Sequence, residues 1–264
     1  MANILDKIIE HKKLEVTSRK AAVSVDTLRQ SKFFARQTLS LKQFLFDENK
    51  TGIIAEFKRK SPSKGIINDK ADVVEVTTAY AKYGASCLSV LTDENFFGGT
   101  SEDLIKARIN NIPILRKDFI IDEYQLTEAR SIGADVILLI AACLTPAKVK
   151  ELAAFAKNLD LEVLLEIHAE EELQHICDEV DVVGVNNRDL KTFTVDINRS
   201  IALSKKIPKE KIKIAESGIS DIETIRIFKD EGFKGFLIGE NFMKAPNPTI
   251  AFAHFVEQLK LKAT

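Results

Sequence analysis

Charged side chains end or interrupt several short apolar segments of this 264-residue sequence. The segment IIAEFK contains Glu56 and Lys58, EVLLEI contains Glu166, and Lys117 follows PILR. An unpaired carboxylate among apolar residues costs free energy, so we expect both glutamates to pair with a cation. The candidate partners are Lys58, Lys117 and Arg188. Buried ion pairs shift pKa values and are common at catalytic sites, although purely structural networks contain them too. The pattern favours general acid–base chemistry.

Polar residues also follow two later apolar segments. Asn186 and Arg188 follow DVVGV, and Glu216 and Ser217 follow KIKIA. If all these segments are strands of one parallel barrel, their polar ends meet at the same mouth. A single charge at a strand end is more often a solvated rim residue, and Glu216 could equally be a structural partner of Lys58. Only the whole set predicts a site.

Two further groups of residues indicate what this site would bind. Gly218 follows Ser217, and Gly239 follows the last apolar segment, where glycines let backbone N–H groups approach a phosphate. Tight turns need glycines anyway, so the position of these glycines carries the inference. Phe96 and Phe97, together with Phe119, either wall a pocket for a flat hydrophobic group or anchor their loops.

From Gly52 onward, the apolar segments alternate eight times with segments of helical periodicity. They are nearly continuous in apolar residues, as expected for strands buried on both faces. The predicted strands are 52–57, 86–91, 113–116, 135–140, 162–167, 181–185, 211–215 and 235–238. The predicted helices are 71–82, 101–109, 122–131, 145–158, 169–178, 196–205, 220–230 and 248–262, with start signals at Thr145 and Ser220. Strict alternation implies parallel strands, and eight units favour closure into a (β/α)8 TIM barrel.

The length of the chain favours a single domain, because about 250 residues is the usual size of this barrel. We expect that domain to span 1–264, with an N-terminal helical extension at 1–50 and the barrel at 51–264. An open doubly wound sheet is the main competitor, but it usually has a glycine-rich turn after its first strand. Here the first strand is followed by KRKSPS, which is a different kind of loop.

The composition restricts the partners of the protein. Lys and Arg number 38 against 39 Asp and Glu, so a net charge of −1 favours neither nucleic acid nor an anionic membrane. No stretch approaches the roughly 18 apolar residues of a spanning helix. The N-terminal segment lacks the features of a secretory signal, which predicts a cytoplasmic protein. We expect a monomer or a weak homo-oligomer that acts on a small phosphorylated molecule.

Metal, cofactor and covalent chemistry are not indicated. Cys87, Cys143 and Cys177 are widely spaced among apolar neighbours, which is typical of buried free thiols. The histidines lack the spacing of a zinc site, and His168 is expected to be a surface residue at a helix start. Nucleophile-elbow, Walker and dinucleotide motifs do not occur. The predicted chemistry uses no metal and no cofactor.

Seven blocks of the sequence stand in a characteristic order: AEFKRKSPSKG, LTDENFFGG, PILRKDFIID, LLEIH, VGVNNRDL, AESGI and FLIGENFM. They resemble the motifs of indole-3-glycerol-phosphate synthase from the first predicted strand to the eighth, with the catalytic positions present. The helical extension is also consistent with that family. The resemblance implies 1-(2-carboxyphenylamino)-1-deoxyribulose 5-phosphate as substrate, which closes to an indole with loss of carbon dioxide and water in tryptophan biosynthesis.

The resemblance also implies roles for individual residues. Lys117 resembles the general acid that protonates the ribulose carbonyl, and Glu166 resembles the acid or base of the later dehydration. Lys58 and Glu56 fit the carboxylate and hydroxyl groups of the substrate. The other positions that would orient or bind the substrate are Asn186, Arg188, Glu216, Ser217, Gly218, Gly239, Glu240, Ser61, Phe96 and Phe119. Some family members carry serine at position 240, so here a backbone N–H would meet the phosphate.

The residues agree with the demands of that substrate. Its phosphate and carboxylate need local cations, which Lys58, Lys117 and Arg188 supply in an otherwise neutral protein. Acid catalysis by Lys117 would be helped by a pKa lowered by desolvation and neighbouring cations. One alternative is phosphoribosylanthranilate isomerase, which is expected to have a cysteine base where this chain has Glu56 and Lys58. The other is a non-catalytic barrel that binds a phosphometabolite but lacks the acid.

Overall fold

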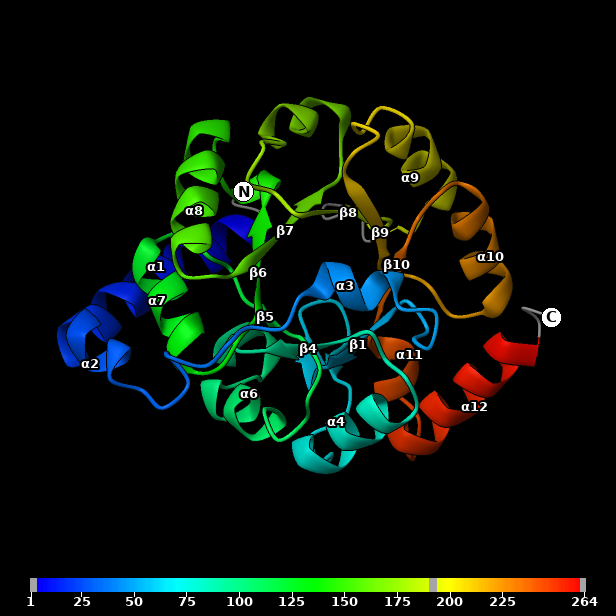
Figure 1. Cartoon of the computed structure of the whole chain (residues 1–264), viewed down its shortest axis with the longest axis horizontal. Coiled ribbons are helices and arrows are strands. Elements are labelled where there is room, and N and C mark those ends of the chain that lie inside the picture. The colour runs from blue at the N-terminus through cyan, green and yellow to red at the C-terminus, as the bar shows by residue number, and fades with distance from the viewer. Residues whose placement is uncertain (1–3, 190–193, 262–264) are drawn as a thin grey trace.

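The computed structural model describes residues 4–189 and 194–261 (Figure 1). Its centre is a closed barrel of parallel strands in the order β1-β10-β9-β8-β7-β6-β5-β4, and β4 closes the ring by pairing with β1. In this described part of the chain, the barrel strands are β1 (Ile53–Phe57), β4 (Cys87–Leu91), β5 (Ile114–Lys117), β6 (Val136–Ile140), β7 (Glu162–Ile167), β8 (Val182–Asn186), β9 (Ile212–Glu216) and β10 (Gly235–Ile238). The predicted (β/α)8 TIM barrel is confirmed.

Helices alternate with the strands and cover the outside of the barrel (Figure 1). They are α4 (Val73–Lys82), α6 (Ser101–Ala107), α7 (Glu123–Ser131), α8 (Pro146–Asn158), α9 (Ile197–Ser204), α10 (Ile222–Asp230) and α12 (Pro248–Leu261), with the short α5 (Glu94–Phe97), η1 (Ala141–Cys143) and α11 (Glu240–Met243) after strands. Thr145 caps α8 as predicted, because its hydroxyl accepts from the Lys148 N–H at 3.2 Å. At α10 the cap is Asp221 rather than Ser220.

Two local features differ from the sequence-based expectations. The segment predicted as a helix at 169–178 forms only the 3-10 turn η2 (Glu170–His175). The carboxylate of its third residue, Glu172, accepts hydrogen bonds from the backbone N–H groups of His168 and Ala169. The turn ends at Ile176 and does not continue as an α-helix. The loop after β1 contains an unpredicted antiparallel hairpin of β2 (Lys60–Ser61) and β3 (Gly65–Ile66).

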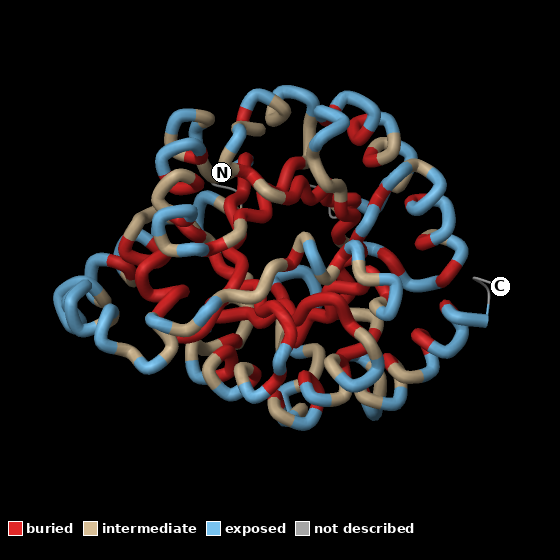
Figure 2. Tube along the Cα trace, in the orientation of Figure 1, coloured by how far each residue is buried: buried red, intermediate tan, exposed pale blue. Residues whose placement is uncertain are grey.

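Buried residues follow the ring of strands and the inner faces of the helices (Figure 2). Alternation along each strand separates two clusters: Ile53 and Phe57 pack outward against helices, whereas Ile54 fills the barrel interior with Leu115 and Leu164. The polar ends of the strands lie beyond this interior cluster. The interior is therefore a packed support beneath the mouth of the barrel.

The N-terminal segment forms α1 (Ile4–Ala22), α2 (Val25–Arg29) and α3 (Leu41–Phe46). Helix α3 lies across the end of the barrel that faces the viewer in Figure 1, and its Leu41 and Leu45 join the interior cluster. Helix α1 contributes Ile4, Leu5 and Ile8 to the cavity at the other end. The extension thus contacts both ends of the barrel. No helix in the described residues is long and apolar enough to cross a membrane.

Candidate active site

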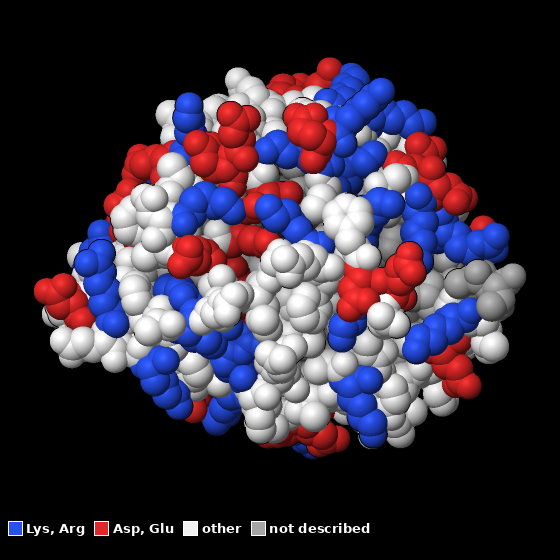
Figure 3. All heavy atoms as spheres, in the orientation of Figure 1, with Lys and Arg blue, Asp and Glu red and all other residues white. Residues whose placement is uncertain are grey.

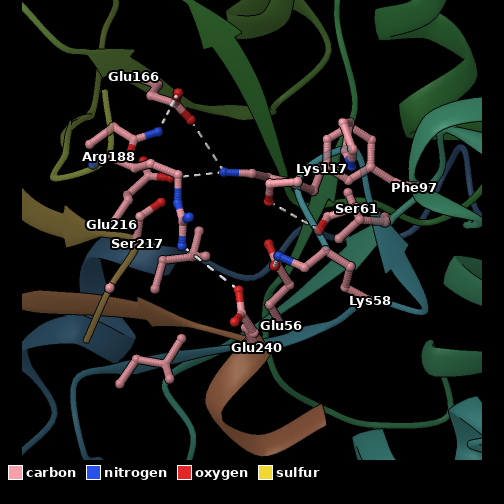
Figure 4. Close-up of a pocket in the computed structure, with 18 of the residues that line it drawn as sticks. Glu56, Lys58, Ser61, Phe97, Lys117, Glu166, Arg188, Glu216, Ser217 and Glu240 are labelled. Carbon is pink, nitrogen blue, oxygen red and sulfur yellow. Dashed lines mark hydrogen bonds and ion pairs between the residues drawn. The ribbon is translucent and has the colours of Figure 1, made fainter. Parts of the chain in front are cut away.

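A cavity of about 400 Å³ lies at the carboxyl ends of the strands. The close-up in Figure 4 shows charged side chains from several strands pointing into it. Thirteen of the fourteen site residues predicted from the sequence line this cavity: Glu56, Lys58, Ser61, Lys117, Phe119, Glu166, Asn186, Arg188, Glu216, Ser217, Gly218, Gly239 and Glu240. The barrel therefore brings together residues that are up to 184 positions apart, from Glu56 to Glu240.

Lys117 is the cation at the centre of this group (Figure 4). Its Nζ is 2.8 Å from Glu216 Oε2 and 3.4 Å from Glu166 Oε2. Burial opposes the charge of the ammonium group, but the attraction of the surrounding carboxylates is larger and raises the pKa of Lys117. The expectation of a lowered pKa was wrong, because the neighbours of Lys117 are carboxylates rather than cations.

Glu166 and Glu216 share Lys117 but differ in their environments. Burial raises the pKa of Glu216 to about 7, although Lys117 opposes this shift. Burial also disfavours the charge on Glu166, but Lys117, His168 and a hydrogen bond from Asn186 Nδ2 at 3.0 Å lower the pKa of Glu166. Two carboxyl groups with pKa values moved in opposite directions can serve as proton donor and proton acceptor at neutral pH.

Glu56 and Lys58 form a second ion pair at the mouth, with 2.7 Å between Nζ and Oε1. Both side chains face inward and Phe57 packs outward, as the alternation along the strand predicts. The alternative pairing of Glu216 with Lys58 is not observed, since Glu216 bonds to Lys117. Gly239 makes room for the second pair, because a Cβ there would lie 2.6 Å from Glu56 Oε1.

The predicted phosphate loops contain an unusual backbone conformation. Ser217 (φ 68°) and Gly218 (φ 70°) are both left-handed, and Asn187 Nδ2 donates to the Ser217 carbonyl at 2.8 Å. Non-glycine residues held in this conformation cluster at binding sites, because the surrounding structure must maintain it. Across the cavity, Arg188 Nη2 lies 3.7 Å from Glu240 Oε2. The loops thus place exposed backbone at Gly218 and the guanidinium group of Arg188 at the same cavity.

The structure corrects the predicted aromatic wall. Phe97, rather than Phe96, is among the described residues that line the cavity, and its ring centroid is 5.9 Å from that of Phe119. Phe96 instead packs edge-on against His11 of α1. Because the two phenylalanines are adjacent on the four-residue helix α5, no periodicity in the sequence indicates which of them faces the cavity.

Two residues near the site were missed or misplaced by the sequence analysis. Gly184 of β8 lies directly against Glu216, since a Cβ there would be 2.0 Å from Glu216 Oε1. His168 is not the surface residue that was expected: its side chain is only 10% exposed and lies between Glu166 and Glu172. A glycine inside the apolar run VVGVN signals close approach of another group, whereas His168 carries no such signal.

In the part of the chain that the structure describes, no group of three or more His, Cys, Asp or Glu side chains is arranged to hold a metal ion. The fold and the cavity are those of a barrel enzyme, with a lysine and carboxyl groups suited to acid–base chemistry beside loops suited to an anion. The family model described as indole-3-glycerol phosphate synthase matches residues 5–255. The chain belongs to this family.

Individual relatives agree with the family model. Indole-3-glycerol phosphate synthase of Bacteroides thetaiotaomicron is 47% identical over 261 residues, covering 98% of this chain and all of the relative. The enzymes of the same name from Polaromonas naphthalenivorans and Salinibacter ruber are 41% and 44% identical, covering 96% and 93% of this chain and 98% and 92% of the relatives.

Solved structures share the fold at low sequence identity. The 3-hexulose-6-phosphate synthase of Salmonella typhimurium superposes with a TM-score of 0.63 at 13% identity, covering 80% of this chain and 99% of that one. KGPDC from Streptococcus mutans gives a TM-score of 0.56 at 16% identity, covering 73% of this chain and 92% of that one.

The family and its relatives give the activity: the chain is a carboxy-lyase that forms indole-3-glycerol phosphate in tryptophan biosynthesis. The isomerase and binding-protein alternatives are not supported.

Proposed function

We propose that Lys117 is the general acid of ring closure and that Glu166 is the acid or base of the dehydration that follows. The observation that carries this proposal is the contact of one lysine with two carboxyl groups inside the cavity, at 2.8 Å to Glu216 and 3.4 Å to Glu166. Because its pKa is raised, Lys117 is protonated at neutral pH and has a proton to give.

The proposed steps follow from the substrate, 1-(2-carboxyphenylamino)-1-deoxyribulose 5-phosphate. The ring carbon that bears the carboxylate bonds to the ribulose carbonyl carbon, and the carbonyl oxygen takes the proton of Lys117. The carbon–carbon bond to the carboxylate then breaks, carbon dioxide leaves, and its electron pair restores the aromatic ring. Loss of the new hydroxyl as water, with loss of a proton from the adjacent methylene carbon, forms the last double bond of the indole, which keeps its N–H. Glu166 is placed to move a proton in this last step.

The remaining residues fit the two ends of the substrate. Lys58 supplies the cation for the anthranilate carboxylate, and Phe97 with Phe119 forms a wall for the aromatic ring. Arg188 and the backbone around Gly218 face the phosphate end, where a phosphate would compete with Glu240 for the guanidinium group. Ser61, Asn186 and Ser217 complete the polar lining and orient the substrate.

We further propose that the protein works in the cytoplasm as a monomer or a weak homo-oligomer. Its three cysteines are all free thiols, which suits a reducing compartment. Lys117 and Glu166 lie 3.4 Å apart within one chain, so the proposed acid–base pair forms without a residue from a second copy.

The two proposed roles are separated by following carbon dioxide and indole in the same reaction. With Lys117→Met, we expect neither carbon dioxide release nor indole fluorescence, because ring closure precedes both. With Glu166→Gln, we expect carbon dioxide release that outruns indole formation, because the hydroxylated intermediate accumulates. If Lys117→Met released carbon dioxide at the wild-type rate, or if Glu166→Gln lost both signals equally, the assignment of the two residues would be wrong.

A further inference from the structure

His168 lies beside Glu166 but is not part of the cavity lining described above. Its Nε2 is 3.4 Å from Glu166 Oε1, and its Nδ1 is 3.7 Å from Glu172 Oε2. The side chain is 10% exposed and is not among the described residues that line the cavity. Strand β7 ends one residue earlier, and the alternation that turns Ile167 outward directs residues 166 and 168 to the same side.

Glu172 is fixed independently of the imidazole ring. Its Oε2 accepts the backbone N–H of His168 at 2.5 Å and that of Ala169 at 3.3 Å, which closes the first turn of η2. The carboxylate therefore keeps its place whether or not the ring is charged. His168 thus lies between two carboxylates of fixed position, that of Glu166 in the cavity wall and that of Glu172 in the first turn of η2.

The surroundings of His168 favour its charged form. In the described part of the chain, neither ring nitrogen makes a hydrogen bond of ordinary length, so a neutral ring would gain little from its position. Burial disfavours the charge, but Glu172 and Glu166 outweigh burial and raise the pKa of His168. The imidazolium form is thus held next to Glu166.

Each neighbouring element contributes a group to this cluster. Lys117 comes from β5 and Glu216 from β9, while Asn186 of β8 donates to Glu166 at 3.0 Å. Cys143 of η1 lies in the field of Glu166, Glu172 and Asp6 of α1, and burial raises the pKa of its thiol, which stays neutral. Two cations therefore act on Glu166, one inside the cavity and one outside it.

These two cations have different fates in the reaction. When Lys117 gives its proton to the substrate, its charge disappears and Glu166 loses one of the two cations that keep it ionised. His168 does not contact the cavity and keeps its charge at that moment. We propose that His168 is a positioning residue that holds Glu166 oriented and ionised while Lys117 is deprotonated. This inference depends on the role proposed above for Glu166.

The test is the pH profile of kcat in His168→Gln, which keeps a polar side chain but removes the charge. We expect the limb that reports Glu166 to move to higher pH by about 1 unit, as for loss of one neighbouring cation, with kcat lowered more than KM is raised. Glu172→Gln leaves the ring in place and should move the same limb by a smaller amount. His254→Gln, an exposed histidine on α12, is the matched control and should leave the profile unchanged.

Superimposable profiles of wild type and His168→Gln would overturn the inference. If His168→Gln does not fold, imidazole NMR titration of the wild type decides, since the chain has only four histidines. An apparent pKa of His168 below the usual value of about 6.5 would then contradict it. Glu166→Gln is measured in parallel: full turnover by that variant would instead remove the proposed role of Glu166 itself.

Discussion

The ionisation of Glu216 couples the site to the stability of the fold. Burial raises its pKa to about 7, well above that of a free glutamate. A carboxyl group whose pKa is higher in the folded than in the unfolded protein stabilises the native state while it is protonated. The contribution of Glu216 to the free energy of unfolding is therefore complete below a pH of about 4, is lost as the pH rises, and is gone above about 7.

Glu216→Gln cannot ionise at this position, so the variant lacks this pH-dependent contribution to stability. The Tm of the wild type should fall relative to that of the variant as the pH rises from about 4 to about 7, and the difference should then level off. Thermal unfolding of both proteins across this range measures it. A difference in Tm that does not depend on pH would contradict the raised pKa.

Gly184 offers a second prediction at the scale of one residue. A methyl group at this position would lie 2.0 Å from Glu216 Oε1 and would push the carboxyl group off Lys117. We expect Gly184→Ala to lower kcat by about 10²-fold, the cost of a misplacement of about 1 Å. Steady-state kinetics on the purified variant measures this.

The control for that variant is Gly235→Ala. Its added methyl group would meet Ile214 and Leu45 at the opposite end of the barrel. It should lower Tm without a comparable loss of kcat. If both variants lost stability and turnover in the same proportion, Gly184 would have only a packing role.

At the scale of elements, one buried lysine fixes α1 to the barrel. Lys12 Nζ lies 3.0 Å from Asp93 Oδ2 and 2.9 Å from Asp118 Oδ1, and all three side chains are fully buried. Asp118 follows Lys117 directly, and Asp93 caps the short helix that carries Phe97. The position of α1 over the cavity is thus tied to two loops that carry site residues.

Lys12→Met would leave Asp93 buried without this cation, and Asp118 would keep Arg116, which lies 3.1 Å away. We expect the free energy of unfolding to fall by about 3–5 kcal/mol, as for a broken buried ion pair, and KM to rise because α1 loosens. Urea unfolding and steady-state kinetics are the measurements. Lys13→Met, which removes an exposed lysine that pairs with the exposed Glu10, is the control. Equal unfolding midpoints for the two variants would show that Lys12 does not anchor the helix.

The sequence was sufficient to predict the helices and strands of the barrel, but not some of the contacts between them. Apolar runs placed the barrel strands within one residue at each end, because burial on both faces leaves a strong local signal. The contact of Gly184 with Glu216 depends on the register between β8 and β9, which no local pattern encodes. The burial of His168 likewise depends on Glu172 turning the chain back, where helical periodicity had predicted a continuous helix.

Over the whole molecule, charge is balanced and the cations that matter are local. Acidic and basic side chains are interspersed on the face shown in Figure 3, in keeping with the net charge of −1. Attraction of an anionic substrate must therefore come from the cavity itself, where Arg188 lies beside the loops proposed to bind the phosphate.

We expect inorganic phosphate at one hundred times its Kd to stabilise the protein by about 2.7 kcal/mol, because it binds only the folded state. Thermal unfolding in phosphate, against sodium chloride of equal ionic strength, measures the effect. Arg188→Met should lose most of the shift in Tm. An equal shift in the variant would mean that phosphate binds elsewhere.

The role of Lys117 as the acid of ring closure is tested by the rate of indole formation by wild type and Lys117→Ala, followed by fluorescence with the carboxyphenylamino-deoxyribulose phosphate as substrate. The exposed Lys229→Ala serves as a control for the loss of a lysine. If Lys117 is the acid of ring closure, its removal should lower kcat by about 10²–10⁴-fold while the variant stays folded. Near-normal turnover by Lys117→Ala would show that another group protonates the carbonyl.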